Sequence, residues 1–149
     1  MEKLHEVAEI QVSYTPTKLV KQQIKSSNDA YKILKEIYPL ETVNLKEHFI
    51  VLYLNNANKV IGSYKLSEGG LTATVADVRI LLGVALKLAA KSIVVSHNHP
   101  SGNLFPSSQD KELTKKLKSG CAFLDISLVD HLIISGENGF YSFADEGEL

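Results

Sequence analysis

The amino-acid sequence predicts an α/β domain in which a mixed β-sheet is flanked by helices. Segments of alternating or continuous apolar residues, typical of strands, occur between segments whose apolar residues follow helical spacing. The chain of 149 residues is long enough to build one hydrophobic core without a disulfide or a structural metal. We therefore expect residues 1–149 to form a single domain.

The amino-terminal part of this domain, residues 1–44, is predicted to hold an edge strand and a helix. Apolar and polar side chains alternate over residues 8–14, until Thr15 and Pro16 stop the pattern. Ser26 and the two residues after it offer an N-cap for a helix that Pro39 ends.

The remaining core, residues 45–143, is predicted to continue with strands and helices in turn. A helix that begins near residue 74 is expected to be the longest in the chain. Another helix, opened by Pro106 and Ser107, is expected to end at Gly120. The expected strands lie at 49–54, 60–66, 93–95, 124–128, 132–134 and 140–143, the first two joined as a hairpin by a turn rich in asparagine.

The composition of the chain argues against several classes of protein. The 16 basic and 17 acidic residues are scattered along the chain, so we expect nucleic acid to bind weakly or indirectly. No apolar run reaches the length of a membrane span, and the amino terminus lacks the apolar region of a secretory signal. The single cysteine, Cys121, excludes an internal disulfide and a cysteine-rich metal cluster. We expect a soluble, cytoplasmic protein without a membrane partner.

Two histidines follow the predicted strand at 93–95. Residues at i and i+2 of a strand project to the same side, so His97 and His99 can direct ring nitrogens toward one point. A catalytic zinc takes three protein ligands and keeps one position open for water. Asp110, in the first turn of the next predicted helix, can supply the third, anionic ligand. The sequence thus predicts a Zn²⁺ site formed by His97, His99 and Asp110.

The spacing of these residues resembles a known motif. The JAMM motif of MPN+ metallohydrolases, H-x-H-x7-S-x2-D, is matched by His97, His99, Ser107 and Asp110. The run HNHPSG at 97–102 looks most like the RadC-type subgroup, also labelled as DNA repair proteins, and the likeness covers roughly residues 45–143. Asn98 stands where JAMM peptidases usually have Ser or Thr, which favours the RadC-type subgroup over the deubiquitinating one.

This resemblance implies a JAB/MPN architecture, related to that of the cytidine deaminases, and a set of roles. It places a general base at Glu47, just before the predicted strand at 49–54, with Glu41 as the fallback. It makes Ser107 the hydrogen-bond donor to the oxyanion. The implied activity is hydrolysis of a peptide or isopeptide bond by a water whose pKa the zinc lowers, with a peptide or protein as substrate.

Several residues have a second interpretation. Ser107 and Asp110 match a helix capping box, and Glu47 can be a solvated charge at a strand entry. Asp130 lies with His131 inside an apolar run, where a buried carboxylate needs a partner, so Asp130 can contact a zinc-binding imidazole; the two adjacent residues cannot both face the site.

The remaining candidates are assigned no chemistry. His5 and His48 are expected at the surface, and Cys121 is expected to be a small buried side chain.

Other functions stay open or are excluded by residue type. A RadC-type DNA repair accessory protein, or a metal-binding protein without turnover, remains an alternative. The roughly 45 residues before the core show no Gly-rich hairpin pattern, so no helix-hairpin-helix domain is expected. A nucleic-acid deaminase needs two cysteine ligands and this chain has one cysteine, and an HNH nuclease matches only in letters.

Overall fold

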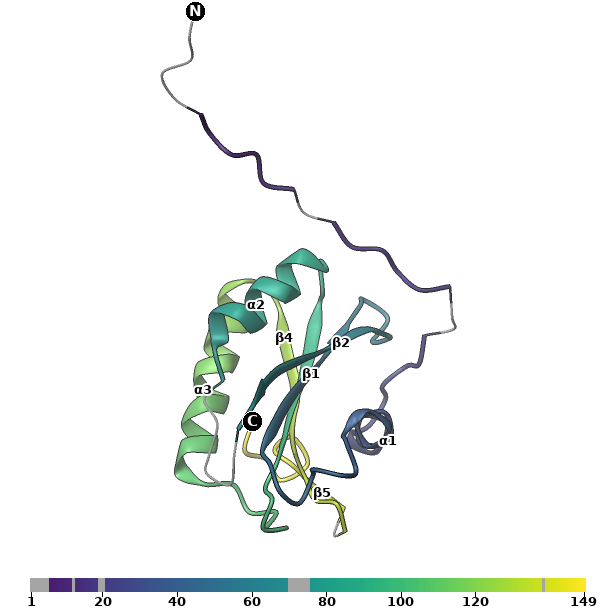
Figure 1. The fold of residues 1–149 in the computed structure, drawn as a ribbon, viewed down its shortest axis with the longest axis vertical. Helices are drawn as coiled ribbons and strands as arrows, with labels where there is room; N and C mark the ends of the chain where they lie inside the picture. Colours follow the sequence, from purple (N-terminus) through teal and green to yellow (C-terminus); the bar gives the residue numbers. More distant parts are fainter. Residues whose placement is uncertain (1–5, 12, 19–20, 70–75, 138) are drawn as a thin grey trace, which may run out of the picture.

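The computed structural model describes residues 6–11, 13–18, 21–69, 76–137 and 139–149. Figure 1 shows a twisted sheet with α1 on one side and α2 and α3 on the other, where α1 is Ser27–Ile37, α2 is Val78–Lys87 and α3 is Ser108–Phe123. Within the described residues, no helix is long and apolar enough to cross a membrane.

The sheet has five strands in the order β2-β1-β3-β4-β5. β3 and β4 are parallel, and the other neighbouring pairs are antiparallel. Every residue of β1 and β3 is buried. This agrees with the nearly continuous apolar sequence of β1, whereas in β3 the buried polar residues Ser96, His97 and Asn98 follow the apolar run at 93–95. The predicted mixed sheet flanked by helices is confirmed, with β3 at its centre. The strands are β1 His48–Leu54, β2 Val60–Glu68, β3 Ser92–Asn98, β4 Ser127–Ile134 and β5 Phe140–Ser142.

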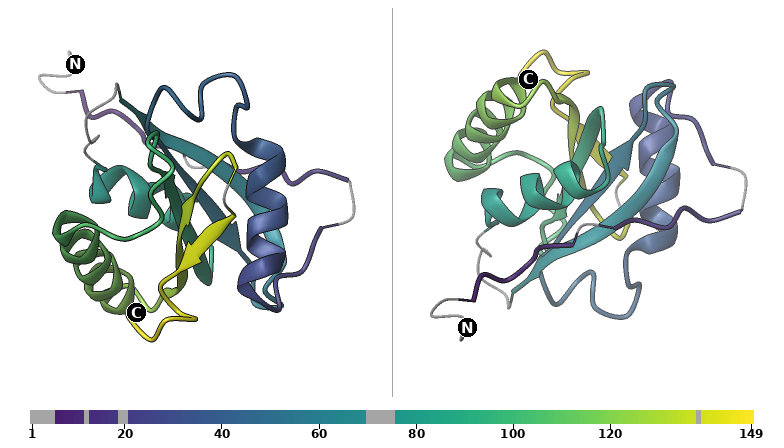
Figure 2. Two further views of the ribbon diagram at one scale, coloured as in Figure 1. Left: turned by 90° about the horizontal axis from the view of Figure 1, so that it is seen from below. Right: turned by 90° about the horizontal axis from the view of Figure 1, so that it is seen from above.

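Each face of the sheet packs against its own helices (Figure 2). On one face, Val51 of β1 and Val95 of β3 belong to a cluster with Leu81 of α2 and Leu117 of α3. On the opposite face, alternate strand residues cluster with Leu34 of α1. Because side chains of a strand alternate between faces, consecutive residues of β1 and β3 serve the two cores in turn.

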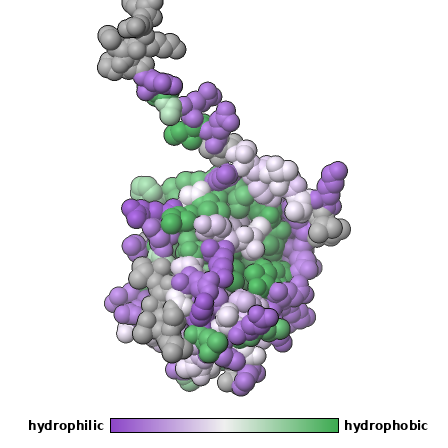
Figure 3. Space-filling view, in the orientation of Figure 1, coloured by the Kyte–Doolittle hydropathy of each residue, from purple (hydrophilic) through white to green (hydrophobic). Residues whose placement is uncertain are grey.

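The helix surfaces turned away from the sheet remain in solvent. Ile80 and Leu86 of α2 are among the exposed apolar residues. Hydrophobic and hydrophilic side chains are interspersed over the face seen in Figure 3. Single exposed apolar residues of this kind are ordinary on a protein surface.

The edge strand predicted at residues 8–14 is wrong for the residues that the structure describes. Residues 6–11 and 13–18 contain no strand, and Figure 1 shows this segment running away from the sheet. Val7 and Ile10 are 90% and 87% exposed. Alternation gives a segment one apolar face, but a strand forms only where a neighbouring strand can pair with it. Val12, part of the same pattern, lies outside the described residues.

Two helix boundaries also differ from the prediction. With 16 residues, α3 is longer than α2, which has 10. Gly120 lies inside α3, where an added Cβ would be 3.2 Å from Leu82 Cδ1. The glycine therefore allows close approach of α3 to α2 instead of ending the helix. Asp77 is the N-cap of α2, and the predicted start at residues 74–75 lies outside the described residues.

β4 is one strand where two were predicted. It runs without a break through Asp130 and His131, both of which are buried. These polar residues do not end the strand, although its register with β3 shifts by one residue just before Asp130. The segment before β4 is a turn, with Asp125 at a φ of 57°.

Asn98, the last residue of β3, anchors the segment between α1 and β1. Its side-chain carbonyl accepts a hydrogen bond from the His48 backbone N–H at 2.7 Å. Its amide group donates to the carbonyls of Val43 and Lys46 at 2.7 and 2.8 Å. The Asn98 side chain is fully buried, so these bonds are shielded from water. They fix the backbone on both sides of Glu47, which lies between Lys46 and His48.

Replacing Asn98 should therefore destabilise the fold strongly. Asn98→Ala leaves the buried His48 N–H, the buried Val43 carbonyl and the partly buried Lys46 carbonyl without their partner, and we expect the free energy of unfolding to fall by at least about 2 kcal/mol. Urea denaturation measures this loss. Asn56→Ala is the matched control, because Asn56 is exposed in the β1–β2 turn, and it should stay within about 0.5 kcal/mol of the wild type. A similarly small effect of Asn98→Ala would contradict the anchoring role.

Candidate metal centre

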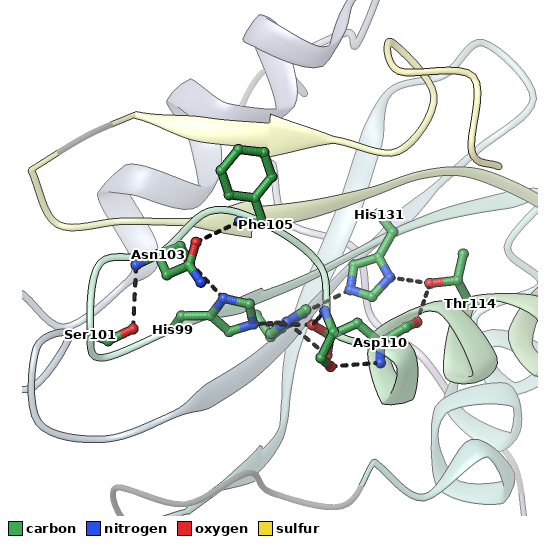
Figure 4. Close-up of polar contacts among 9 residues, drawn as sticks. His99, Ser101, Asn103, Phe105, Asp110, Thr114 and His131 are labelled. Carbon is green, nitrogen blue, oxygen red and sulfur yellow. Dashed lines mark hydrogen bonds and ion pairs between the residues drawn. The ribbon is translucent and has the colours of Figure 1, made fainter.

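Three side chains meet at the carboxyl end of β3 (Figure 4). His97 lies on β3, His99 follows the strand, and Asp110 lies in the first turn of α3. His97 Nε2 is 3.0 Å from His99 Nε2 and 3.2 Å from Asp110 Oδ1. His99 Nε2 is 3.1 Å from Asp110 Oδ2. The structure thus brings the predicted ligand set together in a group that could hold a metal ion.

The capping box of α3 orients Asp110. Its carboxylate accepts a hydrogen bond from the Ser107 backbone N–H at 2.8 Å, and its own N–H donates to Ser107 Oγ at 3.1 Å. The capping box predicted for these two residues is therefore present in the structure. It does not compete with a ligand role, since an ionised carboxylate offers about four lone-pair positions. The cap holds the carboxylate in place against the histidines.

The loop after His99 fixes the orientation of that ring. His99 Nδ1 lies 2.6 Å from the Asn103 carbonyl, which can only accept, so Nδ1 carries a proton and, in the neutral ring that a metal requires, Nε2 presents a lone pair to the site. Gly102, at a φ of 82°, donates its N–H to the His99 carbonyl at 2.9 Å. Asn103 also accepts from the Phe105 N–H at 3.1 Å. The short loop is held to one conformation by its own hydrogen bonds.

Two further residues touch the site from behind His97. His131 of β4 lies with Nε2 at 2.8 Å from His97 Nδ1, and its own Nδ1 is 2.7 Å from Thr114 Oγ1 of α3. Asp130 has other contacts: it accepts from the Ser142 hydroxyl at 2.6 Å and from the Ala144 N–H at 3.0 Å. The contact considered for Asp130 is therefore wrong, and its neighbour His131 is the residue that contacts a predicted ligand.

Thr114 was not predicted as part of the site. The available signal is its spacing: it lies four residues after Asp110 on the same helix, so both occupy one face of α3. Its hydroxyl donates to the Asp110 carbonyl at 2.7 Å.

The electrostatic field of the site favours a cation. Burial raises the pKa of Asp110, but hydrogen bonds from His97 and His99 outweigh this and hold the pKa well below its usual range. The hydrogen bond to Asp110 raises the pKa of His99 against the effect of burial, and the charge of Glu47 adds to the rise. Two imidazole nitrogens and one carboxylate oxygen match the donors of a catalytic zinc site. The residues present therefore fit the metal that the sequence predicts.

Glu47 is the predicted base. It directly precedes β1, it is 9% exposed, and it lies two residues before Phe49, which pairs with His97 of β3. Its charge contributes to the raised pKa of His99. The fallback, Glu41, is exposed in the preceding turn. Ser107, the predicted oxyanion donor, is exposed at the amino end of α3.

The predictions for the other candidate residues are partly correct and partly wrong. His48 was expected at the surface but is fully buried on the α1 face, with Nε2 at 3.0 Å from Thr42 Oγ1 and a pKa that burial lowers. Cys121 is fully buried as predicted, and burial raises the pKa of its thiol to about 11. His5 lies outside the described residues.

The raised pKa of His99 predicts opposite effects of pH with and without metal. In the metal-free protein, the contribution of His99 and Asp110 to stability is full below the unfolded pKa of about 6.5 and is lost as pH rises through the raised folded pKa. Zinc needs neutral His99, so its stabilising effect should grow over the same range. Thermal melts across this range, with and without zinc, measure both trends.

His99→Gln is the reference for these melts. Buried His131 and His48 have lowered pKa values and give stability that falls at low pH, but burial, the largest cause of both shifts, is present in wild type and variant alike. The advantage in melting temperature of metal-free wild type over His99→Gln should shrink as pH rises. An advantage that grows with pH would show that the two groups do not pair as described.

Comparisons with known proteins agree with this geometry. The sequence model of the RadC-like JAB domain matches residues 24–148. A UPF0758 protein of Flavobacterium johnsoniae is 45% identical over 126 residues, which are 85% of this chain and 53% of the relative. A UPF0758 protein of Porphyromonas gingivalis is 40% identical over 125 residues, 84% of this chain and 55% of the relative. One of Methanococcoides burtonii is 39% identical over 129 residues, 87% of this chain and 55% of the relative.

The chain thus spans about half the length of these curated relatives. The matched region contains the whole sheet, all three described helices and the ligand group. The resemblance stated from the HNHPSG run is confirmed, and the chain belongs to the RadC-like JAB domain family.

Proposed function

We propose that this domain is a zinc-dependent hydrolase of the JAMM type that cleaves a peptide or isopeptide bond. The observation that carries the proposal is the convergence of His97, His99 and Asp110 at distances of 3.0 to 3.2 Å, with Glu47 beside them. A structural zinc would fill all its positions with protein ligands, whereas three ligands leave one for water. The donor set therefore supports a catalytic site over a purely structural one.

The metal and Glu47 divide the chemistry. When bound, zinc supplies a Lewis acid that polarises the substrate carbonyl and lowers the pKa of a water to about 7. Glu47 takes the proton from the attacking water and returns it to the leaving amine. Its backbone is fixed for this purpose, because Asn98 holds the residues on both sides of it.

Ser107 is proposed to stabilise the developing oxyanion. Its oxygen accepts from the Asp110 N–H, and a hydroxyl that accepts one hydrogen bond still has its own proton to donate. Ser107 also lies at the amino end of α3, where the helix dipole favours negative charge. Capping and oxyanion stabilisation therefore use different parts of the same hydroxyl group.

The substrate is proposed to be a peptide or protein. Nucleic-acid contact remains a prediction of weak or indirect binding, since the basic and acidic residues number 16 and 17. An accessory role in DNA repair requires a specific contact with DNA, and no contact of the described residues favours that role over hydrolysis.

Glu47→Gln tests the proposed division of roles. The variant keeps the size of the side chain but lacks the proton acceptor, so we expect zinc content to stay at the wild-type level while turnover falls by a factor of about 100 or more. Turnover is measured with zinc-loaded protein on a panel of linear peptides and peptides acylated on a lysine side chain. Glu41→Gln, an exposed glutamate in the preceding turn, is the control and should match the wild type.

Two results would overturn the proposal. Full turnover by Glu47→Gln would remove Glu47 as the base, and loss of zinc by that variant would make it a ligand. If zinc-loaded wild type cleaves nothing in either class of peptide, the proposal of a peptidase is wrong and metal binding without turnover takes its place.

A further inference from the structure

We propose that Thr114 and His131 form a hydrogen-bond relay that sets the tautomer of His97 and so presents the His97 Nε2 lone pair to the metal. The inference rests on the proposed metal centre and adds two positioning residues to it. The relay runs from the Asp110 carbonyl through the Thr114 hydroxyl to the His131 ring (Figure 4), and from that ring to His97 Nδ1.

The direction of the relay is decided at Thr114. The Asp110 carbonyl oxygen, 2.7 Å from Thr114 Oγ1, can only accept a hydrogen bond. A hydroxyl has one proton, and here it goes to that carbonyl. Towards His131 Nδ1, also at 2.7 Å, Thr114 Oγ1 can then only accept. The proton between them therefore belongs to His131 Nδ1.

The tautomer of His131 determines the tautomer of His97. The His131 ring is fully buried, stacked on Phe143 at 4.6 Å between centroids and near Phe49 at 6.0 Å. Such surroundings favour the neutral ring, which carries a single proton. With that proton on Nδ1, His131 Nε2 is an acceptor, and His97 Nδ1 at 2.8 Å must donate to it.

The consequence is a metal-ready His97. In the neutral ring the proton lies on Nδ1, so Nε2 offers a lone pair to a metal on the side of His99 Nε2 and Asp110 Oδ1. A neutral imidazole in water prefers the opposite tautomer, with the proton on Nε2, which would block this position. His99 reaches the same state through a different acceptor, the Asn103 carbonyl. The two histidine ligands are therefore oriented independently.

The relay also links the ligands to each other. It begins on the backbone of Asp110 and ends on His97, while the Asp110 side chain meets the same histidine at 3.2 Å. These contacts connect α3 to β3 through β4. Partners of this kind behind a ligating histidine typically change metal affinity by a factor of 10 to 100.

Zinc affinity in two threonine variants tests the relay. Thr114→Val keeps the shape of the side chain and removes the hydroxyl, and we expect its zinc affinity, measured by competition with a chromophoric chelator, to fall by about 10- to 100-fold. Thr114→Ser keeps the hydroxyl and should stay close to the wild type. Cys121→Ala, a buried change on the same helix, controls for altered packing and should also bind zinc like the wild type.

The tautomers themselves give a readout that needs neither metal nor substrate. Long-range ¹H–¹⁵N correlation spectra of the metal-free protein should show His131 protonated on Nδ1 alone in the wild type and in Thr114→Ser. In Thr114→Val, His131 should lose this single state. The spectrum does not depend on zinc. If the wild type binds no zinc, the proposed metal centre is wrong, but the spectrum still shows whether Thr114 sets the tautomer of His131.

Two results would overturn the relay. His131 protonated on Nε2 in the wild type would mean that Thr114 donates to the ring and that the direction is reversed. Wild-type zinc affinity in Thr114→Val, with its fold intact by thermal melting, would show that the hydroxyl does not support the ligand.

Discussion

The convergence of three electron-pair donors is the constraint on which the site depends. His97, His99 and Asp110 place nitrogen and oxygen atoms 3.0 to 3.2 Å apart, a distance that is favourable only when a proton or a cation lies between them. The fold holds these atoms in place, because a fully buried strand, a capped helix and a hydrogen-bonded loop each position one donor. A divalent cation would relieve the repulsion at all three atoms together.

The alternation of side chains along β3 gives this short stretch two tasks. His97 contributes to the ligand group on the side of α2 and α3, while its neighbour Asn98 reaches the opposite side and fixes the backbone around Glu47. Asparagine suits this position because one side chain both accepts and donates. A serine or threonine there could not make all three bonds, so the Asn98 departure from the usual JAMM pattern has a structural reason.

The sequence predicted those parts of the fold and site that depend on local spacing. The ligand set could be located because strand periodicity and a helix start place it without knowledge of distant contacts, whereas Glu47 was located only through the resemblance to the JAMM family. His131 and Thr114 were missed, since their contact with His97 depends on how α3 and β4 pack. The prediction that Gly120 ends α3 was wrong for the same reason. The glycine allows α3 to approach α2 closely, which no local sequence pattern indicates.

Zinc content measured in wild type and in ligand variants tests the central claim most directly. Elemental analysis of the purified protein, refolded with zinc and freed of excess, should give about one zinc per chain. Asp110→Asn keeps the size of the side chain and should lose most of the metal, whereas Asp77→Asn, which changes the cap of α2 away from the ligand group, should keep it. Zinc bound by Asp110→Asn with wild-type affinity would contradict the three-ligand site.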